Sequence, residues 1–181
     1  AVEAPASGVG YHLRADETLH YHTTFSVHHG FAGKRVILHF DAVDYKCEVL
    51  LNGKSAGSHT GGYDPFYFDI SALLGDGTQT LDVFVTDPTE NGDQQRGKQV
   101  AKSANIWYNA TSGIWQRVWH EAVPVISIDD IHIVPDIDKQ LINVDTTLSS
   151  EQGCTLEMKV FLNGNDVVSR IISDSEQIGL P

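Results

Sequence analysis

Hydrophobic and polar residues alternate along most of this chain, which is the pattern of β-strands with one buried face. The alternation is clear over residues 35–40 and again over residues 47–51. Asn52 and Gly53 come directly after the second segment, and this pair is typical of a type I′ hairpin because both turn residues need a positive φ. The pattern therefore predicts a strand over residues 35–40 and a second strand over residues 47–51. A turn at Asn52-Gly53 then leads into a return strand.

The same pattern predicts many short strands and almost no helix. A single helical turn is expected over residues 69–74, capped by Asp69 or Ser71. Trp115 and Trp119 have the same parity in one segment, so we expect both rings to be buried. Short strands separated by Gly, Asn, Asp and Pro favour an all-β sandwich or jelly roll. The further strands are expected at residues 21–27, 66–70, 81–86, 114–121, 126–134, 141–148, 155–162 and 166–172.

The composition of the chain changes after Pro124. Beyond Trp119 the sequence has a single aromatic residue, Phe161. We therefore place a domain boundary near residue 125. The segment 126–181 has 56 residues, which is about half of the roughly 100 residues in a complete immunoglobulin-like sandwich.

Charge and length exclude several classes of protein. The net charge of -12 and the pI near 4.9 have the wrong sign for binding nucleic acid or an anionic membrane. The chain lacks an apolar run of membrane-spanning length and a signal-peptide pattern, so we expect a soluble protein and leave its compartment open between cytoplasmic and periplasmic or secreted. Cys47 and Cys154 form no metal or redox motif and are expected to be buried thiols.

A long segment with little periodicity is the main candidate for a binding site. It has 27 residues between Thr86 and Ile114, and loops longer than about 12–15 residues are usually functional or disordered. Aromatic faces match the C–H faces of a pyranose, and planar polar side chains bind its hydroxyls. Trp107 and Tyr108, flanked by Asn105 and Asn109, supply these residue types. The alternative is that the rings of Trp107 and Tyr108 pack inward and only anchor the loop. The candidate sugar-binding residues in this loop are Arg96, Lys98, Gln99, Trp107 and Tyr108.

Catalytic and metal-binding motifs are not apparent. A glycosidase needs two carboxyl groups roughly 5 to 9.5 Å apart. The sequence indicates no such pairing among the acids on predicted strands and loops, which are Glu48, Glu90, Glu121 and Glu157. A nucleophile elbow, a P-loop and a dinucleotide fingerprint are absent from the sequence. His20 and His22 share a strand face, but no Cys or carboxylate spacing supplies further ligands. We therefore expect no catalytic residue, no metal and no cofactor.

Seven segments occur in the order found in one known family: residues 35–44, 49–54, 57–66, 68–70, 85–88, 96–99 and 112–119. Together they resemble the N-terminal jelly-roll domain of glycoside hydrolase family 2, which includes β-galactosidases, β-glucuronidases and β-mannosidases. The resemblance covers residues 11–125, and the residues after 125 resemble the first strands of the family's immunoglobulin-like domain. It implies an all-β fold with a jelly-roll sugar-binding domain at 1–125 and a partial immunoglobulin-like β-sandwich at 126–181.

The resemblance also implies a role without catalysis. In that family a (β/α)₈ barrel carries both catalytic glutamates, one of them after an asparagine, and this sequence has no Asn-Glu pair. The chain of 181 residues is also too short for a barrel of about 250 residues. We therefore expect a carbohydrate-binding and scaffold fragment of a larger β-galactosidase or β-glucuronidase, with the barrel of the same polypeptide and a β-glycoside as partners. The alternative is a free-standing carbohydrate-binding module.

Within this resemblance, the loop residues 96–99 and 107–108 are expected to reach the neighbouring active site. Asn52, in the matched Asn-Gly turn, is a lesser candidate. The sequence departs from the family pattern at His20-Tyr21-His22-Thr23, where relatives often have an aromatic residue followed by Tyr-Arg-Arg.

The second segment presents apolar residues that half a sandwich leaves uncovered. Residues 141–148 and 155–162 each place their apolar side chains on one face. Folded proteins normally mask exposed apolar faces and open strand edges. We therefore expect this segment to be poorly ordered or to pair with another copy in a homodimer.

Overall fold

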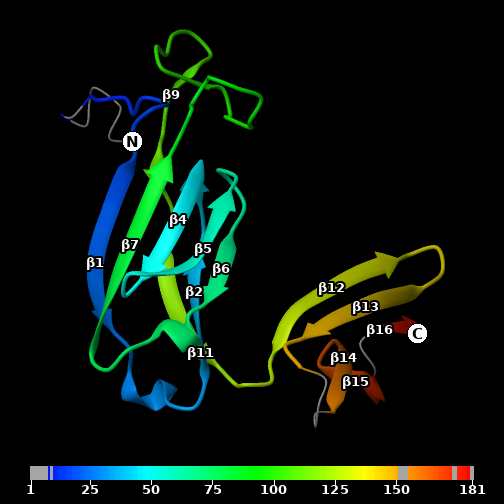
Figure 1. Cartoon of the computed structure of the whole chain (residues 1–181). Coiled ribbons are helices and arrows are strands. Elements are labelled where there is room, and N and C mark those ends of the chain that lie inside the picture. The colour runs from blue at the N-terminus through cyan, green and yellow to red at the C-terminus, as the bar shows by residue number, and fades with distance from the viewer. Residues whose placement is uncertain (1–7, 9, 151–154, 173–174, 180–181) are drawn as a thin grey trace. The chain divides into compact units, whose positions relative to one another are not determined.

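The structure is a computed structural model that describes residues 8, 10–150, 155–172 and 175–179. The chain divides into two compact units, residues 1–122 and 123–181. The described residues are almost entirely in strands and loops, which confirms the prediction of an all-β fold (Figure 1). Within these residues, no helix has the length and apolar character needed to cross a membrane.

The first unit contains two main antiparallel sheets. One sheet has the strand order β1 (Leu19–Ser26), β7 (Thr78–Thr86), β4 (Lys46–Leu51) and β5 (Lys54–Thr60). The other has the order β11 (Val118–Val123), β2 (Arg35–Phe40) and β6 (Phe66–Asp69). The described part of this unit also has two short two-stranded sheets. In one, β3 (Val43–Asp44) pairs with β10 (Gly113–Ile114) in antiparallel orientation. In the other, β8 (Gln99–Val100) pairs with β9 (Tyr108–Asn109) in parallel orientation.

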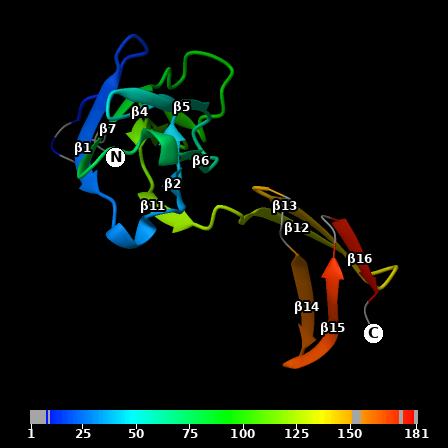
Figure 2. The same cartoon turned by 60° about the horizontal axis from the view of Figure 1, so that its bottom comes forward.

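The core of the first unit lies between these two sheets. Alternate residues of β2, β4 and β7 point inward, as the sequence alternation predicts, and form one cluster. Figure 2 shows β2 and β11 in a layer separate from β4 and β5. The fold of this unit is therefore a β-sandwich. Its core includes Val36, Leu38, Phe40, Val43, Cys47, Val49, Leu51, Ile70, Leu81, Val83 and Val85.

Two local predictions are confirmed. Asn52 and Gly53 have φ values of 52° and 76°, so the β4–β5 hairpin has the expected turn. A short 3₁₀ helix, η3, covers Ser71–Leu73, as predicted. The predicted capping by Asp69 or Ser71 is wrong, because the N-cap residue is Ile70, whose apolar side chain makes no capping hydrogen bond; the Asp69 carboxylate accepts from the Ser71 backbone N–H at 3.0 Å. A further short helix in the described residues, η2, covers His29–Phe31.

The prediction of one continuous strand over residues 114–121 is wrong for residues 115–117. The structure ends β10 at Ile114 and begins β11 at Val118, so the strand is interrupted at residues 115–117. Trp115 and Trp119 remain 42% and 41% exposed, whereas the sequence predicts burial. The reason is that each indole N–H is directed to an acceptor outside the core: Trp115 Nε1 donates to the Gly62 carbonyl at 2.8 Å, and Trp119 Nε1 donates to Asp41 Oδ1 at 3.0 Å.

Cys47 is buried in the sandwich core as a free thiol, as the sequence predicts. Burial raises the pKa of its thiol to about 11. Cys154, the other predicted buried thiol, lies outside the described residues.

The second unit contains two small antiparallel sheets (Figure 2). The first has the order β12 (Ile128–Asp136), β13 (Leu141–Leu148) and β16 (Ser175–Gly179). The second is a hairpin of β14 (Leu156–Leu162) and β15 (Asn165–Ile172). Asn163 and Gly164 connect this hairpin with φ values of 51° and 82°, which repeats the turn at Asn52.

Candidate functional site

The long loop predicted as a binding site covers residues 87–112 and leaves the sandwich where β7 ends, beside the label β9 in Figure 1. Its two ends are tied together by the buried carboxylate of Asp87. That carboxylate accepts a hydrogen bond from the Ser112 hydroxyl at 2.6 Å and another from the Thr89 backbone N–H at 2.7 Å. A buried carboxylate needs such donors, so the base of the loop is fixed to the sandwich.

Gln99 holds the middle of the loop against the rest of the first unit. Its Nε2 donates to Tyr63 Oη at 3.3 Å and to Asp44 Oδ2 at 3.4 Å, and its Oε1 accepts from the Thr111 backbone N–H. Because both ends of this amide have protein partners, the structure gives Gln99 a positioning role.

Gly97 allows the loop to pass close over Tyr63. Its φ is 53°, and a Cβ at this position would lie 2.5 Å from Tyr63 Oη. A side chain at Gly97 would therefore push the loop away from Tyr63.

Arg96 and Trp107 contact each other across the loop. The guanidinium carbon of Arg96 lies 5.9 Å from the centre of the Trp107 ring, within cation–π range. Arg96 Nη1 also donates to the Glu90 carbonyl at 3.1 Å. These contacts bring together two of the residues that the sequence singles out.

Trp107 and Tyr108 are 41% and 63% exposed, so neither ring is buried under the loop. The Tyr108 backbone N–H donates to the Lys98 carbonyl at 3.0 Å, which joins β8 to β9. Lys98 has a φ of 64° at this crossing. The parallel β8–β9 pair therefore fixes the backbone of the loop while its aromatic side chains face outward.

Two aromatic residues that the sequence pattern does not single out for binding adjoin this loop. The rings of Tyr63 and Trp115 form an edge contact with centroids 6.1 Å apart, and both are partly exposed. Tyr63 also accepts from Gln99, so the pair is connected to the loop. In the sequence, Tyr63 follows the glycine pair Gly61-Gly62, which indicates a tight turn but does not place the ring beside the loop. We call Tyr63, Arg96, Trp107, Tyr108 and Trp115 the aromatic rim.

Asn52 does not lie with the aromatic rim. Lys46 of β4 pairs with Thr86, where the loop begins. Asn52 follows the opposite end of β4, about 20 Å from Lys46 at strand spacing. The side chain of Asn52 is held locally: Nδ2 donates to Gln79 Oε1 at 2.7 Å, and Oδ1 accepts from the Thr80 N–H at 2.9 Å. These bonds account for Asn52 as a turn residue.

The acidic residues considered for catalysis lie in separate sheets. Glu48 is on β4, on the outer face of the four-stranded sheet, and Glu121 is on β11. Glu121 Oε1 is 3.0 Å from His39 Nε2. Strand placement therefore does not pair these two carboxylates across one cleft.

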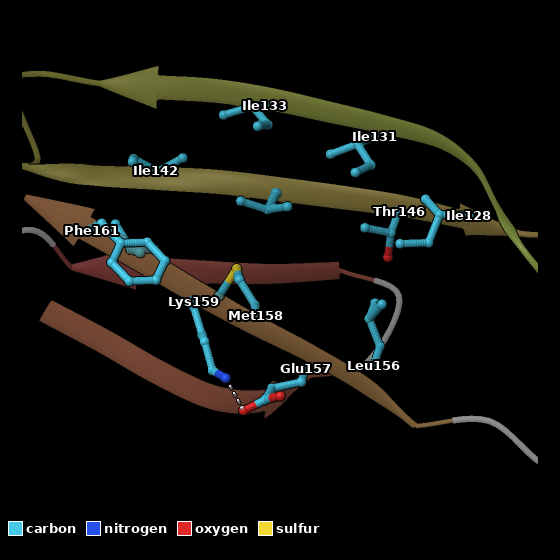
Figure 3. Close-up of a pocket in the computed structure, with 12 residues that line it drawn as sticks. Ile128, Ile131, Ile133, Ile142, Thr146, Leu156, Glu157, Met158, Lys159 and Phe161 are labelled. Atoms are coloured by element: carbon cyan, nitrogen blue, oxygen red, sulfur yellow. Dashed lines mark ion pairs between the residues drawn. The ribbon is translucent and has the colours of Figure 1, made fainter. Parts of the chain in front are cut away.

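The second unit has an apolar groove of about 510 Å³ between its two sheets. Figure 3 shows side chains of β12 and β13 directed toward those of β14 across the groove. Most are apolar, and the charged lining residues Glu157 and Lys159 form an ion pair at 3.1 Å. The groove is lined mainly by Ile128, Ile131, Ile133, Ile142, Val144, Leu156, Met158, Val160 and Phe161.

Comparison with known families gives one match that covers more than half of the chain. A model described as glycosyl hydrolase 2 galactose-binding domain-like matches residues 10–120. This range contains the whole loop and all strands of the two main sheets except the last three residues of β11.

Curated relatives share the same region. A beta-galactosidase of Thermoanaerobacter pseudethanolicus is 31% identical over 117 residues, which are 64% of this chain and 15% of the relative. A beta-galactosidase of Bacteroides ovatus is 28% identical over 163 residues, which are 88% of this chain and 18% of the relative. The chain therefore spans less than a fifth of the length of either relative.

A solved structure has the same fold. The beta-glucuronidase of Faecalibacterium prausnitzii superposes with a TM-score of 0.73 at 24% identity, covering 97% of this chain and 33% of that chain. At this identity the likeness establishes the fold alone.

Proposed function

Because the chain belongs to the glycosyl hydrolase 2 galactose-binding domain-like family, we propose that it is a non-catalytic carbohydrate-binding and scaffold part of a family 2 glycoside hydrolase. Residues 1–125 form the jelly-roll sugar-binding domain in this proposal, and residues 126–181 form a partial immunoglobulin-like sandwich. The whole protein hydrolyses a β-galactoside or a β-glucuronide.

The observation that carries the proposal is the exposure of Trp107 and Tyr108 on a loop with a fixed backbone. Aromatic faces stack on the C–H faces of a pyranose, and a fixed loop loses little conformational entropy when a sugar binds. The guanidinium of Arg96 beside the Trp107 ring adds donors for hydroxyl or carboxylate oxygens. The aromatic rim therefore offers both kinds of contact that a sugar needs.

The reaction itself belongs to another part of the longer protein in this proposal. Support comes from the curated relatives, of which the chain spans 15% and 18%. The partner of the loop is the catalytic barrel of the same polypeptide, and the aromatic rim borders its active site. Arg96, Lys98, Trp107 and Tyr108 contact the glycoside, and Gln99 positions them.

A hydrolysis assay tests the absence of catalysis. The purified chain is incubated with 4-nitrophenyl β-D-galactoside and with the corresponding β-D-glucuronide. We expect no release of 4-nitrophenol above the buffer rate, because Glu48 and Glu121 lie in separate sheets. Release that disappears in Glu48→Gln or Glu121→Gln would show that the chain is itself a hydrolase.

A kinetic assay separates the active-site role from a free-standing binding module. In the full-length enzyme, Trp107→Ala is expected to raise KM or lower kcat for the aryl glycoside. An enzyme whose kcat and KM are unchanged, combined with sugar binding that Trp107→Ala abolishes in the chain, would favour the free-standing module instead.

The apolar groove of the second unit needs a covering partner in this proposal. Its lining is mostly Ile, Leu, Val, Met and Phe, and exposed apolar surface of this kind favours association. We assign a second copy of the chain as the partner when the chain is alone in solution, and other strands of the longer polypeptide in the enzyme.

A further inference from the structure

Three side chains that commonly bind metals converge on the outer face of the four-stranded sheet. His20 and His22 are two positions apart on β1, so they point to the same face. Asp82 of β7 lies directly opposite His22 in the strand register and points to that face as well. The sequence alone did not reveal this group, because Asp82 is distant in the chain and only strand pairing brings it to the histidines.

The distances within this group are short. His20 Nε2 and His22 Nδ1 each lie 2.7 Å from Asp82 Oδ1. The three ligand atoms all lie within 4.8 Å of one another. Both imidazole nitrogens are therefore directed at the same carboxylate oxygen, and the three potential ligand atoms form a compact group.

The size of the group suits a zinc-like ion. Ligand atoms about 2.1 Å from a tetrahedral Zn²⁺ are about 3.4 Å apart. The contacts of 2.7 Å would therefore open by about 0.7 Å, which side-chain rotation on an exposed sheet face can supply. Nitrogen and oxygen donors of this kind favour Zn²⁺ and the neighbouring first-row dications over Mg²⁺ or Ca²⁺.

One ligand is held in place by its neighbour. The His20 ring stacks on Phe84, with centroids 4.4 Å apart and planes 12° apart, and the two residues are opposite each other in the register. This stacking restricts the ring of His20 while its Nε2 remains directed at Asp82. The acidic chain, with a net charge of -12, also favours a cation over an anion at this surface.

We propose that His20, His22 and Asp82 form a binding site for Zn²⁺ or a similar first-row dication, with solvent as the fourth ligand. The two histidine side chains are exposed, which leaves that position open to water. Because β1 is the edge strand of its sheet, the metal joins this edge to β7. The site does not depend on the sugar-binding role of the loop.

Competition with a chromogenic zinc chelator measures the affinity and stoichiometry of Zn²⁺ on the whole chain. We expect one saturable site in the wild-type protein. Replacing a ligand is expected to weaken binding by about tenfold or more, since even the loss of residues that orient a ligand typically costs this much. Asp82→Asn and His22→Gln test the two kinds of ligand.

His132→Gln is the matched control. His132 Nδ1 lies 3.8 Å from Asp145 Oδ2, so it is a histidine beside a carboxylate in the second unit. We expect this variant to keep the wild-type affinity. Because His22 is exposed, His22→Gln is expected to fold normally, as circular dichroism can verify, even if Asp82→Asn does not.

Imidazole ¹⁵N chemical shifts give a second readout that identifies the atoms. On addition of Zn²⁺, Nε2 of His20 and Nδ1 of His22 are expected to shift together at one equivalent of metal. Absence of saturable binding, an affinity that His22→Gln leaves unchanged, or shifts confined to other histidines would overturn the proposal.

Discussion

The imidazole of His39 lies flat against the indole of Trp119, with ring centroids 4.0 Å apart and planes 9° apart. This stack joins β2 to β11 on the outer side of their sheet. The same indole donates from Nε1 to Asp41 Oδ1 at 3.0 Å, and Arg117 Nε lies 2.9 Å from Asp41 Oδ2. Through these contacts with His39 and Asp41, Trp119 holds β11 against β2, just after the interruption at residues 115–117.

A pH-dependent effect is expected from these contacts. The hydrogen bond from Trp119, and then that from Arg117, lower the pKa of Asp41 below its ordinary value of 3.8. A carboxyl group with a lowered pKa in the folded state adds stability above its ordinary pKa and loses it as the pH falls through the folded value. In Trp119→Phe we expect the pKa of Asp41 to rise toward 3.8, as followed by its carboxyl ¹³C shift.

Trp107→Phe is the control for this titration, because Trp107 contacts Arg96 and not Asp41. The pKa of Asp41 is expected to stay at its wild-type value in that variant. An identical pKa of Asp41 in the wild type and in Trp119→Phe would show that the indole hydrogen bond is not responsible.

The thiol of Cys47 is predicted to be unreactive in the folded protein. Burial raises its pKa from 9.0 to about 11, so only about 1% is thiolate at pH 9. In a Cys154→Ser background, which removes the other cysteine, a chromogenic disulfide reagent should label Cys47 only after denaturation. Rapid labelling of the native protein would contradict the burial of Cys47.

The base of the loop is predicted to depend on Ser112. Ser112→Ala removes the hydroxyl that donates to the buried Asp87 carboxylate, which keeps its bonds from Thr89, and a hydrogen bond to a charged group contributes about 1.5–3 kcal/mol. We expect the free energy of unfolding to fall by that amount in urea denaturation, and amide exchange in residues 87–112 to accelerate. Ser103→Ala, at an exposed position of the same loop, should change the free energy of unfolding by less than about 0.5 kcal/mol.

Local patterns predicted much of the fold, whereas contacts between distant residues decided the rest. Alternation located β2 and β4, and turn chemistry predicted the positive φ at Asn52, because both depend on neighbouring residues. The break between β10 and β11 could not be predicted, since it arises where Trp115 reaches the carbonyl of Gly62.

The candidate site shows the same division between local and distant contacts. The length and aromatic content of the loop singled out Trp107 and Tyr108, and the structure places both at the surface. Residue type alone could not distinguish Gln99, which holds the loop, from Arg96, which faces the Trp107 ring. Tyr63 was missed because its connection to the loop runs through Gln99.

The apolar groove predicts self-association of the isolated chain. Ile133 lines the groove, whereas Val134 is the next residue on β12 and points to the opposite face. Losing the burial of one isoleucine costs about 2 kcal/mol, so Ile133→Lys should weaken a dimer by more than about tenfold. Val134→Lys should leave the dimer intact in sedimentation velocity, and a wild-type chain that stays monomeric at all concentrations would contradict the predicted pairing.

Calorimetric titration of the chain with methyl β-D-galactoside and methyl β-D-glucuronide tests the central claim most directly, that the aromatic rim binds sugar. We predict saturable binding of one of these sugars, weakened about fivefold or more in Trp107→Ala because an aromatic contact is worth about 1 kcal/mol beyond the area it buries. Tyr67→Ala, which removes an exposed ring of β6 outside the rim, should bind as the wild type does. Binding that Trp107→Ala leaves unchanged, or no binding of either sugar, would contradict sugar recognition by the aromatic rim.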